Sequence, residues 1–431
     1  MKNINHYSFV IIILFFSFLI PEQYLAQESW EVFQKEISVS QYEGNHFRVQ
    51  AFIKTDVEDD SASARLRTAV RLENGYGFYE NMYYLPIRSK EWKVYTIEGI
   101  IDSGATHLEF GPIVQFNGKF YYDLIKVEVE TEKNNWVKIY SCDFENDLDG
   151  FEQGFDGRKN PTFNTSIISN EAAEGNKCLL IEGKNVPNFG VNNKVGKYAD
   201  VNGIKLYYEI YGNGYPLLVL HGNGGSIASS FILPELIKKY KVIAVDSRAQ
   251  GNSTDTDEEL TYEQMASDVS ELLEKLNIDS VYIWGHSDGA IIGLILAMEH
   301  PEKVSKLLAF GTNIQSDSIF PWYIKHVDNT LANTHNANVK KLYMLMKNHP
   351  NIPFSKLSKI KTPVLIMAGD RDTIRPEHTL KLFQSIPNSQ LCIIPGATHS
   401  ARKEKKELFL QILEDFFDKP FSMPSTEDYY K

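Results

Sequence analysis

The amino-terminal part of the chain alternates apolar and polar residues with a period of two. Between about residues 30 and 140 the apolar members include Phe47, Val49, Ala51 and Ile53, then Leu66, Val70 and Leu72, and then Ile125, Val127 and Val129. In an extended strand this spacing gives one apolar and one polar face, which is typical of half-buried antiparallel sheets. Turn sequences such as Glu73-Asn74-Gly75 separate the runs, and no long helical pattern intervenes. The pattern predicts an all-β sandwich over residues 27–140.

After Lys197 the pattern changes to short, nearly continuous apolar runs at 216–220, 241–245, 280–284, 306–310 and 363–367. Amphipathic stretches lie between them, for example 262–276. Strands that are buried on both faces and alternate with helices predict a mostly parallel sheet with flanking helices over residues 197–420. Ligands bind at the carboxyl ends of the strands in such folds, so the chemistry is expected just after the apolar runs.

Two segments are less well defined by their pattern. Residues 141–196 are rich in Asn, Gly, Asp and Glu, and they are either the remaining strands of the sandwich, the remnant of a second one, or a linker. Residues 421–431 form a polar tail.

The amino terminus begins with a short positively charged segment that contains Lys2, followed by an apolar run from Phe9 to Ile20 and a small residue at Ala26. This order predicts a secretory signal over residues 1–26, with the mature protein secreted or periplasmic. The alternative is an uncleaved anchor, although the run is shorter than the ~20 residues that span a bilayer. No stable membrane span is therefore expected.

The overall charge excludes one class of partner. The chain of 431 residues has 56 acidic and 44 basic side chains, a formal net charge of −12, which opposes binding to nucleic acid. Three cysteines suit an oxidising compartment: either Cys142 and Cys178 pair, or all three are free thiols. Cys392 lies in an apolar run and is expected in a buried strand. No spacing typical of a metal site is present.

A candidate nucleophile follows the run that ends at Trp284. The sequence Gly285-His286-Ser287-Asp288-Gly289 stands between a predicted strand and a predicted helix that Pro301 ends. A serine on such a sharp turn has strained backbone angles, and glycines two residues to either side leave room for the close approach of the chain. The turn exposes the hydroxyl near the positive end of the helix.

A base and an acid follow later strands. His399 comes after the last apolar run. An imidazole has an unperturbed pKa near 6.5, so it can both accept and donate a proton near neutral pH. Asp372 and Asp370 follow the strand that ends at Met367, and we prefer Asp372 as the residue that orients the imidazole because it lies deeper in the loop. The glycine-rich sequence 220–225 predicts an oxyanion hole formed by the backbone N–H groups of Asn223 and Asp288. Each feature alone has a structural explanation: a turn, a core histidine or a solvated loop.

Residues 201–417 resemble the α/β-hydrolase superfamily, in particular its small esterases and lactonases. The order Ser287, Asp372, His399 is that of the superfamily, residues 201–208 resemble its opening hairpin, and residues 246–253 resemble its D-x-R-G-x-G-x-S loop, with Ala249 where glycine is usual. The resemblance implies an α/β hydrolase fold and a serine hydrolase that cleaves a carboxylic ester or lactone through an acyl-enzyme, without a cofactor. A serine at position 287 argues against the dehalogenase branch, whose nucleophile is a carboxylate.

The lid and the sandwich carry the remaining expectations. Residues 313–354 would form a small lid, and Phe320, Trp322 and Tyr323 are candidates for an apolar substrate pocket, or else for packing of the lid. The sandwich resembles jelly-roll modules, many of them carbohydrate-binding, in FRVQAFIK (47–54), WKVYTI (92–97) and GKFYYD (118–123). Its basic residues Arg65, Arg67 and Arg71 suggest an anionic glycan partner, or else a solvated face paired with carboxylates.

Two other functions remain open. The same site suits C–C bond or amide hydrolysis, and the chain could instead be a glycan-binding protein with an inactive hydrolase scaffold.

Overall fold

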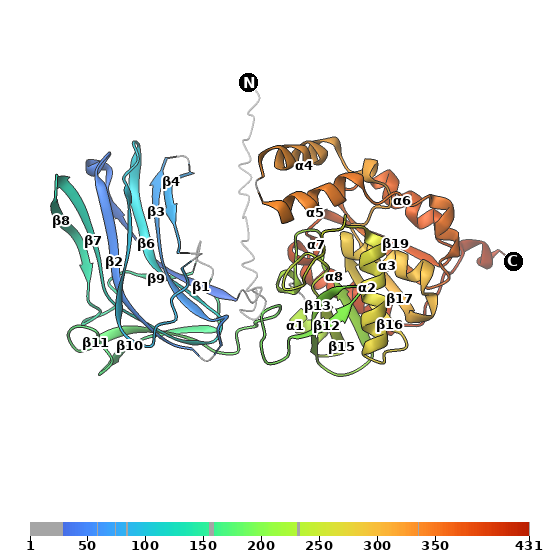
Figure 1. Ribbon diagram of the computed structural model, residues 1–431, viewed down its shortest axis with the longest axis horizontal. Helices are drawn as coiled ribbons and strands as arrows, with labels where there is room; N and C mark the ends of the chain where they lie inside the picture. Colours follow the sequence, from blue (N-terminus) through green and yellow to red (C-terminus); the bar gives the residue numbers. More distant parts are fainter. Residues whose placement is uncertain are drawn as a thin grey trace, which may run out of the picture.

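The computed structural model describes residues 29–57, 59–73, 75–82, 85–154, 159–230, 233–334 and 336–430, and the predicted signal sequence lies outside them. Figure 1 shows two bodies, an all-β body built from strands β1–β11 and an α/β body built from β12 onwards, joined by the segment between β11 and β12. Within the described residues, no helix combines the length and the apolar character needed to cross a bilayer.

The amino-terminal body consists of two antiparallel sheets, which confirms the predicted all-β fold. The first sheet has the order β4 (Gly75–Glu80), β3 (Ser63–Leu72), β6 (Ala105–Gln115), β1 (Trp30–Ser38) and β9 (Glu152–Gln153). The second has the order β10 (Phe163–Ser169), β11 (Lys177–Gly183), β7 (Gly118–Glu132), β2 (His46–Asp56) and β5 (Lys93–Ile100), with β8 (Asn135–Cys142) paired to β7.

The period-two pattern places the apolar side chains between these sheets. On β2, Phe47, Val49 and Ile53 are fully buried, and Phe47 and Val49 lie opposite Val129 and Val127 of β7. The intervening polar residues on β2 lie on the outer face and are half-buried. The alternation along each strand therefore decides which face packs into the core.

Several basic residues of the sandwich are paired with carboxylates, whereas Arg65 donates to the side-chain amide of Gln115. Arg48 donates to Glu128 across neighbouring strands, with Nε and Oε2 2.6 Å apart. Arg67 and Arg71 both contact Glu109 of β6, and the side chains of Arg67 and Glu109 are each only 4% exposed. Arg67 is thus part of a buried ion pair rather than of a solvated face.

The segment over residues 141–196, which the sequence left undefined, contributes strands to the sandwich. Strand β10 pairs with β11, and β11 pairs with the core strand β7. All three cysteines are free thiols: Cys142 and Cys178 are buried, and Cys392 is half-buried on β19.

The carboxy-terminal body has an eight-stranded sheet with the order β12 (Lys197–Val201), β13 (Ile204–Tyr211), β15 (Lys241–Val245), β14 (Pro216–Leu220), β16 (Val281–His286), β17 (Val304–Phe310), β18 (Val364–Arg371) and β19 (Ser389–Thr398). The pairs β12–β13 and β13–β15 are antiparallel, and the other neighbouring strands of this sheet are parallel. One face of the sheet packs against α2 (Tyr262–Lys275), α3 (Asp288–Glu299) and α6 (Pro376–Ser385), and the other against α1 (Leu233–Leu236), α7 (Ala401–Glu404) and α8 (Lys406–Asp418).

Two further helices, α4 (Pro321–Asn333) and α5 (Ala337–Asn348), lie between β17 and β18 in the chain and beyond one end of the sheet in space (Figure 1). Single β-bridges, Gln315 to Asn351 and Ile319 to Ile374, fix the base of this segment. The predicted lid region therefore contains a pair of helices over the carboxyl ends of the strands.

Candidate active site

Ser287 lies on a sharp turn between β16 and α3. Its φ of +54° and ψ of −117° are strained for a residue with a side chain. A Cβ atom at Gly285 would lie 2.4 Å from the carbonyl oxygen of Gly289, and one at Gly289 would lie 2.3 Å from that of Leu220. Both glycines are therefore required by the close approach of the backbone, as the sequence motif predicts.

His399 and Asp372 form a hydrogen-bonded pair next to this turn. His399 follows β19 and Asp372 follows β18, and Nδ1 of the imidazole lies 2.7 Å from Oδ1 of the carboxylate. The same oxygen accepts the backbone N–H of Ile374 at 3.1 Å. Asp370 instead accepts the N–H of Gly396. Of the two candidate acids, the structure places Asp372 against the imidazole.

The environment keeps Asp372 ionised. Its side chain is 1% exposed, and burial acts to raise its pKa. The hydrogen bond and the charge of His399 outweigh that effect, so the pKa of Asp372 lies below its usual value. A buried carboxylate that stays charged can hold the Nδ1–H tautomer, which leaves Nε2 of His399 as the proton acceptor.

Ser287 and His399 line one small cavity together with Asp288. Its volume is about 30 Å³, and the other lining residues are Tyr262, Asn313, Ile319, Tyr323, Met346, His349, Thr373 and Ile374. Of the predicted pocket residues, only Tyr323 is in this set; Trp322 is 60% exposed, and Phe320 precedes α4. This volume is much smaller than the roughly 300–1,000 Å³ of ordinary ligand pockets.

The predicted oxyanion loop passes close to the nucleophile. A Cβ atom at Gly222 would lie 3.0 Å from Cβ of Ser287, so the backbone that leads into Asn223 runs beside the serine. The amide side chain of Asn223 donates to Oδ2 of Asp288 at 3.0 Å and to the carbonyl oxygen of Leu342.

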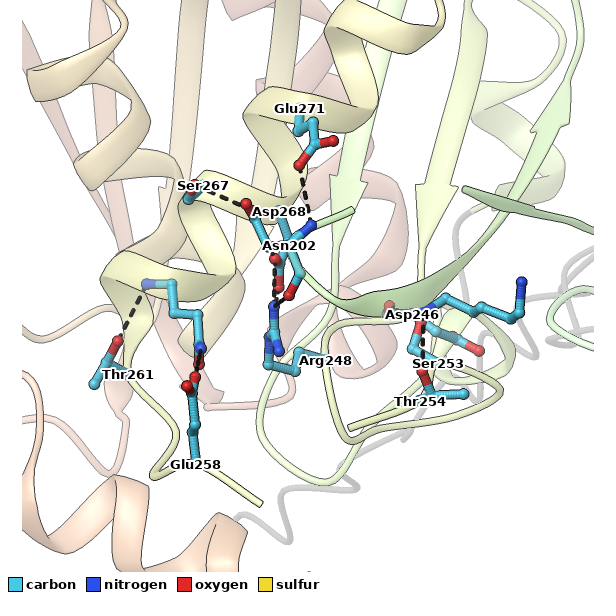
Figure 2. A network of polar contacts seen from close by, with 12 residues as sticks. Asn202, Asp246, Arg248, Ser253, Thr254, Glu258, Thr261, Ser267, Asp268 and Glu271 are labelled. Carbon is cyan, nitrogen blue, oxygen red and sulfur yellow. Dashed lines mark hydrogen bonds and ion pairs between the residues drawn. The ribbon is translucent and has the colours of Figure 1, made fainter. Parts of the chain in front are cut away.

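The loop after β15 holds the glycine-rich segment around Gly224 in place through hydrogen bonds. Gln250 accepts the backbone N–H of Gly224 at 2.7 Å, and Asp246 accepts that of Ile227 at 2.7 Å. Figure 2 shows how the loop is anchored: Arg248 donates to both carboxylate oxygens of Asp268 on α2, at 2.8 and 2.6 Å.

Ala249, which follows the anchoring arginine, has a φ of +65°. Glycine is favoured at that angle, so this departure from the loop pattern places an alanine in a strained position.

Two further histidines lie near the site. His221 accepts the N–H of Ser247 through Nε2, and burial lowers its pKa to about 4, so it is a neutral part of the scaffold. The ring of His286 lies against that of His399, with centroids 4.8 Å apart, and burial lowers its pKa far below the usual value. The sequence indicated no role for His286, which occupies a variable position of the motif. Its contact with His399 could not be predicted because the two residues lie at the ends of strands that are distant in the chain.

A second, larger cavity lies on the first sheet of the sandwich. It has a volume of about 330 Å³ and is lined by Trp30, Val32, Arg65, Arg67, Tyr76, Tyr79, Asn81, Ile113 and Gln115. Trp30, Tyr76 and Tyr79 are 38%, 42% and 53% exposed.

Comparisons with known proteins agree with the fold. A family model described as the alpha/beta hydrolase fold matches residues 215–343. The chain is 29% identical over 261 residues to serine hydrolase BPHL of Mus musculus, which covers 54% of this chain and 89% of that protein. It is 23% identical over 242 residues to a putative esterase/lipase of Haemophilus influenzae, covering 47% of this chain and 83% of that protein.

Among solved structures, the enol-lactonase from Burkholderia xenovorans LB400 is similar to 52% of this chain over all of its own length, with 21% identity and a TM-score of 0.45. The sheet order, the family match and the curated relatives lead to one assignment. The carboxy-terminal body of this chain is an α/β-hydrolase-fold enzyme.

Proposed function

We propose that the protein is a secreted serine hydrolase that cleaves a carboxylic ester or lactone with Ser287, His399 and Asp372. The observation that carries the proposal is the strained turn at Ser287, whose side chain lines the same cavity as a histidine paired to a buried carboxylate. A serine hydroxyl is a weak nucleophile unless an adjacent base takes its proton, and this arrangement supplies the base and its orienting acid.

The reaction proceeds in two halves. The hydroxyl oxygen of Ser287 attacks the carbonyl carbon while Nε2 of His399 takes the proton, and the backbone N–H groups of Asn223 and Asp288 stabilise the oxyanion. The imidazolium gives the proton to the leaving alkoxide as the C–O bond breaks, which leaves an acyl-enzyme. Water then loses a proton to His399 and attacks the acyl carbon, and Ser287 regains its proton as the acid leaves.

Covalent labelling tests this mechanism. A fluorophosphonate probe is expected to modify Ser287 alone, as shown by mass spectrometry of the peptides. Ser287→Ala should remain folded and lose up to ~10⁶ in turnover of a 4-nitrophenyl ester. Comparable esterase activity in that variant, or labelling of a different serine, would refute the proposal. A matched set of esters, amides and C–C cleavage substrates separates ester hydrolysis from the other two reactions.

We propose that residues 1–26 direct export and are then removed. The support is the order of charged, apolar and small residues in the sequence. Amino-terminal sequencing of the extracellular or periplasmic protein should begin near Gln27. A mature protein that retains Met1 and sediments with membranes would favour an anchor instead.

We also propose that the sandwich cavity holds a glycan with anionic groups. The cavity combines partly exposed aromatic side chains, which stack on sugar faces, with the guanidinium group of Arg65. Affinity electrophoresis in gels containing polyuronic acid or neutral glucan tests it. Retardation by the uronate gel that is lost in Tyr79→Ala is expected, and equal mobility in both gels would refute it.

A further inference from the structure

The side chain of His286 has no role in the mechanism above, although it lies among the groups that the mechanism uses. His286 is the last residue of β16 and directly precedes Ser287. A Cβ atom at Gly222, in the predicted oxyanion loop, would lie 3.1 Å from Nδ1 of His286. The ring of His286 also lies against that of His399, with centroids 4.8 Å apart. This side chain therefore borders both the oxyanion loop and the base, and it is next to the nucleophile in the chain.

A polar contact joins His286 to the backbone of His399. Nε2 of His286 lies 3.0 Å from the carbonyl oxygen of His399, which is within hydrogen-bond distance, and Nη1 of Arg402 lies 3.1 Å from the same nitrogen. Burial lowers the pKa of His286 far below the usual value, so its ring is neutral and carries a single N–H. Nε2 can therefore donate to the carbonyl oxygen or accept from the guanidinium group, but it cannot do both.

The surroundings favour the hydrogen bond to the carbonyl oxygen. The backbone just before His399 is held by Glu404, which accepts the N–H of Thr398 at 2.8 Å and its hydroxyl at 2.6 Å. An unprotonated Nε2 of His286 would face the carbonyl oxygen with lone pair against lone pair at 3.0 Å, and this anchored backbone could not move away. The guanidinium group of Arg402 ends a flexible side chain, so it can turn when Nε2 carries the proton.

The hydrogen bond to Asp372 fixes only one point on the imidazole of His399. The ring can still turn about the contact between its Nδ1 and Oδ1 of the carboxylate. Gly311, with a φ of +61°, approaches the same ring closely, since a Cβ atom there would lie 2.7 Å from its Cε1. His286 borders the ring as well and contacts the backbone from which it extends. These contacts together restrict the direction in which Nε2 of His399 points.

We propose that His286 is a positioning residue, which holds His399 within reach of Ser287 by donating a hydrogen bond from Nε2–H to the carbonyl oxygen of His399. The proposal rests on the proposed ester hydrolysis. A misplacement of about 1 Å can cost about 10² in rate, because proton transfer needs the base within hydrogen-bond reach. The described residues that line the cavity with Ser287 do not include His286, so its effect is expected in kcat rather than in KM.

Two amide side chains of different length test this hydrogen bond. In His286→Gln the side-chain NH₂ group can occupy the place of Nε2–H, whereas in His286→Asn the same group ends near the place of Nδ1. We expect His286→Asn to lower kcat for a 4-nitrophenyl ester by about 10–100-fold with KM nearly unchanged, and His286→Gln to recover most of that loss. Equal kcat values in the two variants, or a loss confined to KM, would overturn the proposal.

Folding is measured separately, by denaturant unfolding of each variant. His286→Leu supplies a side chain of similar size without a polar group, and its kcat is expected to fall as in His286→Asn. The comparison of glutamine with leucine therefore replaces that of glutamine with asparagine if His286→Asn does not fold. His300→Asn is the matched control, because it makes the same substitution at the far end of α3 and should keep kcat.

Nitrogen-15 NMR of the histidine rings gives a readout that does not depend on activity. In protein labelled with ¹⁵N-histidine, the ring signals that disappear in His286→Gln belong to His286. We expect these signals to report the Nε2–H tautomer in the unaltered chain. The Nδ1–H tautomer, in which Nε2 would accept from Arg402, would overturn the proposal.

The outcomes separate this proposal from the proposed function. Fluorophosphonate labelling of Ser287 in the unaltered chain, with equal kcat in the glutamine, asparagine and leucine variants, would overturn the role of His286 and leave the serine hydrolase intact. Absence of both labelling and ester cleavage in the unaltered chain would refute the serine hydrolase itself.

Discussion

Replacing Asp372 by asparagine tests the charge of the orienting carboxylate separately from its geometry. Oδ1 of Asp372 accepts both the N–H of Ile374 and Nδ1–H of His399. These two donors favour the carbonyl oxygen of an asparagine at the same position, so the tautomer of the imidazole should be kept. Only the negative charge is then lost.

The size of the effect follows from the distance. His399 Nδ1 and Asp372 Oδ1 are 2.7 Å apart, which places the delocalised charges of imidazolium and carboxylate about 4 Å apart. At an effective dielectric constant of about 20, this attraction is about 4 kcal/mol. Since about 1.4 kcal/mol corresponds to a factor of ten in rate, Asp372→Asn should lower kcat/KM about 10³-fold.

The assay is hydrolysis of a 4-nitrophenyl ester, with far-ultraviolet circular dichroism to confirm folding. Asp370→Asn is the matched control, because Asp370 is two residues away and accepts the N–H of Gly396 rather than contacting the imidazole. This control should stay within a few-fold of the unaltered enzyme. A loss below 10-fold in Asp372→Asn, or an equal loss in Asp370→Asn, would refute the assignment of Asp372.

Three other predictions concern stability, each measured by denaturant unfolding. Asp268→Asn should lower the free energy of unfolding by about 3–5 kcal/mol, because Arg248 would be left buried without its charge partner; a loss below 1 kcal/mol would contradict this. Gly289→Ala should cost at least about 1–3 kcal/mol, because its Cβ would lie 2.3 Å from a carbonyl oxygen of β14, and an unchanged midpoint would argue against the turn. Burial lowers the pKa of His221 and of His378 to about 4, below the value of about 6.5 in the unfolded chain. The unfolded chain therefore binds more protons, and each imidazole should reduce stability by about 2 kcal/mol at pH 5 relative to pH 7, whereas a flat profile would exclude their burial as neutral groups.

The sequence alone determined the all-β pattern of the first body, the alternation of strands and helices in the second, and the location of the turn that carries the serine. Alternation on residues such as Phe47 and Val49 reports a strand with one buried face, because successive side chains of a strand point to opposite sides. The glycines at 285 and 289 are a local requirement of the turn at Ser287, so the motif and its strained backbone angles are readable over five residues.

Long-range packing decided which residues meet. The choice between Asp370 and Asp372 depends on how the loop after β18 lies beside β19. On α4, Tyr323 lines the cavity that contains Ser287, whereas its neighbour Trp322 is largely exposed. The pairing of β10 with β11 and of β11 with β7 is likewise a property of the assembled sheet. The hydrophobic periodicity of a segment follows from the backbone geometry of its own strand or helix, so it can be read from the local sequence. The neighbours of a side chain come from strands and loops tens of residues away, and only the tertiary structure fixes which of them are in contact.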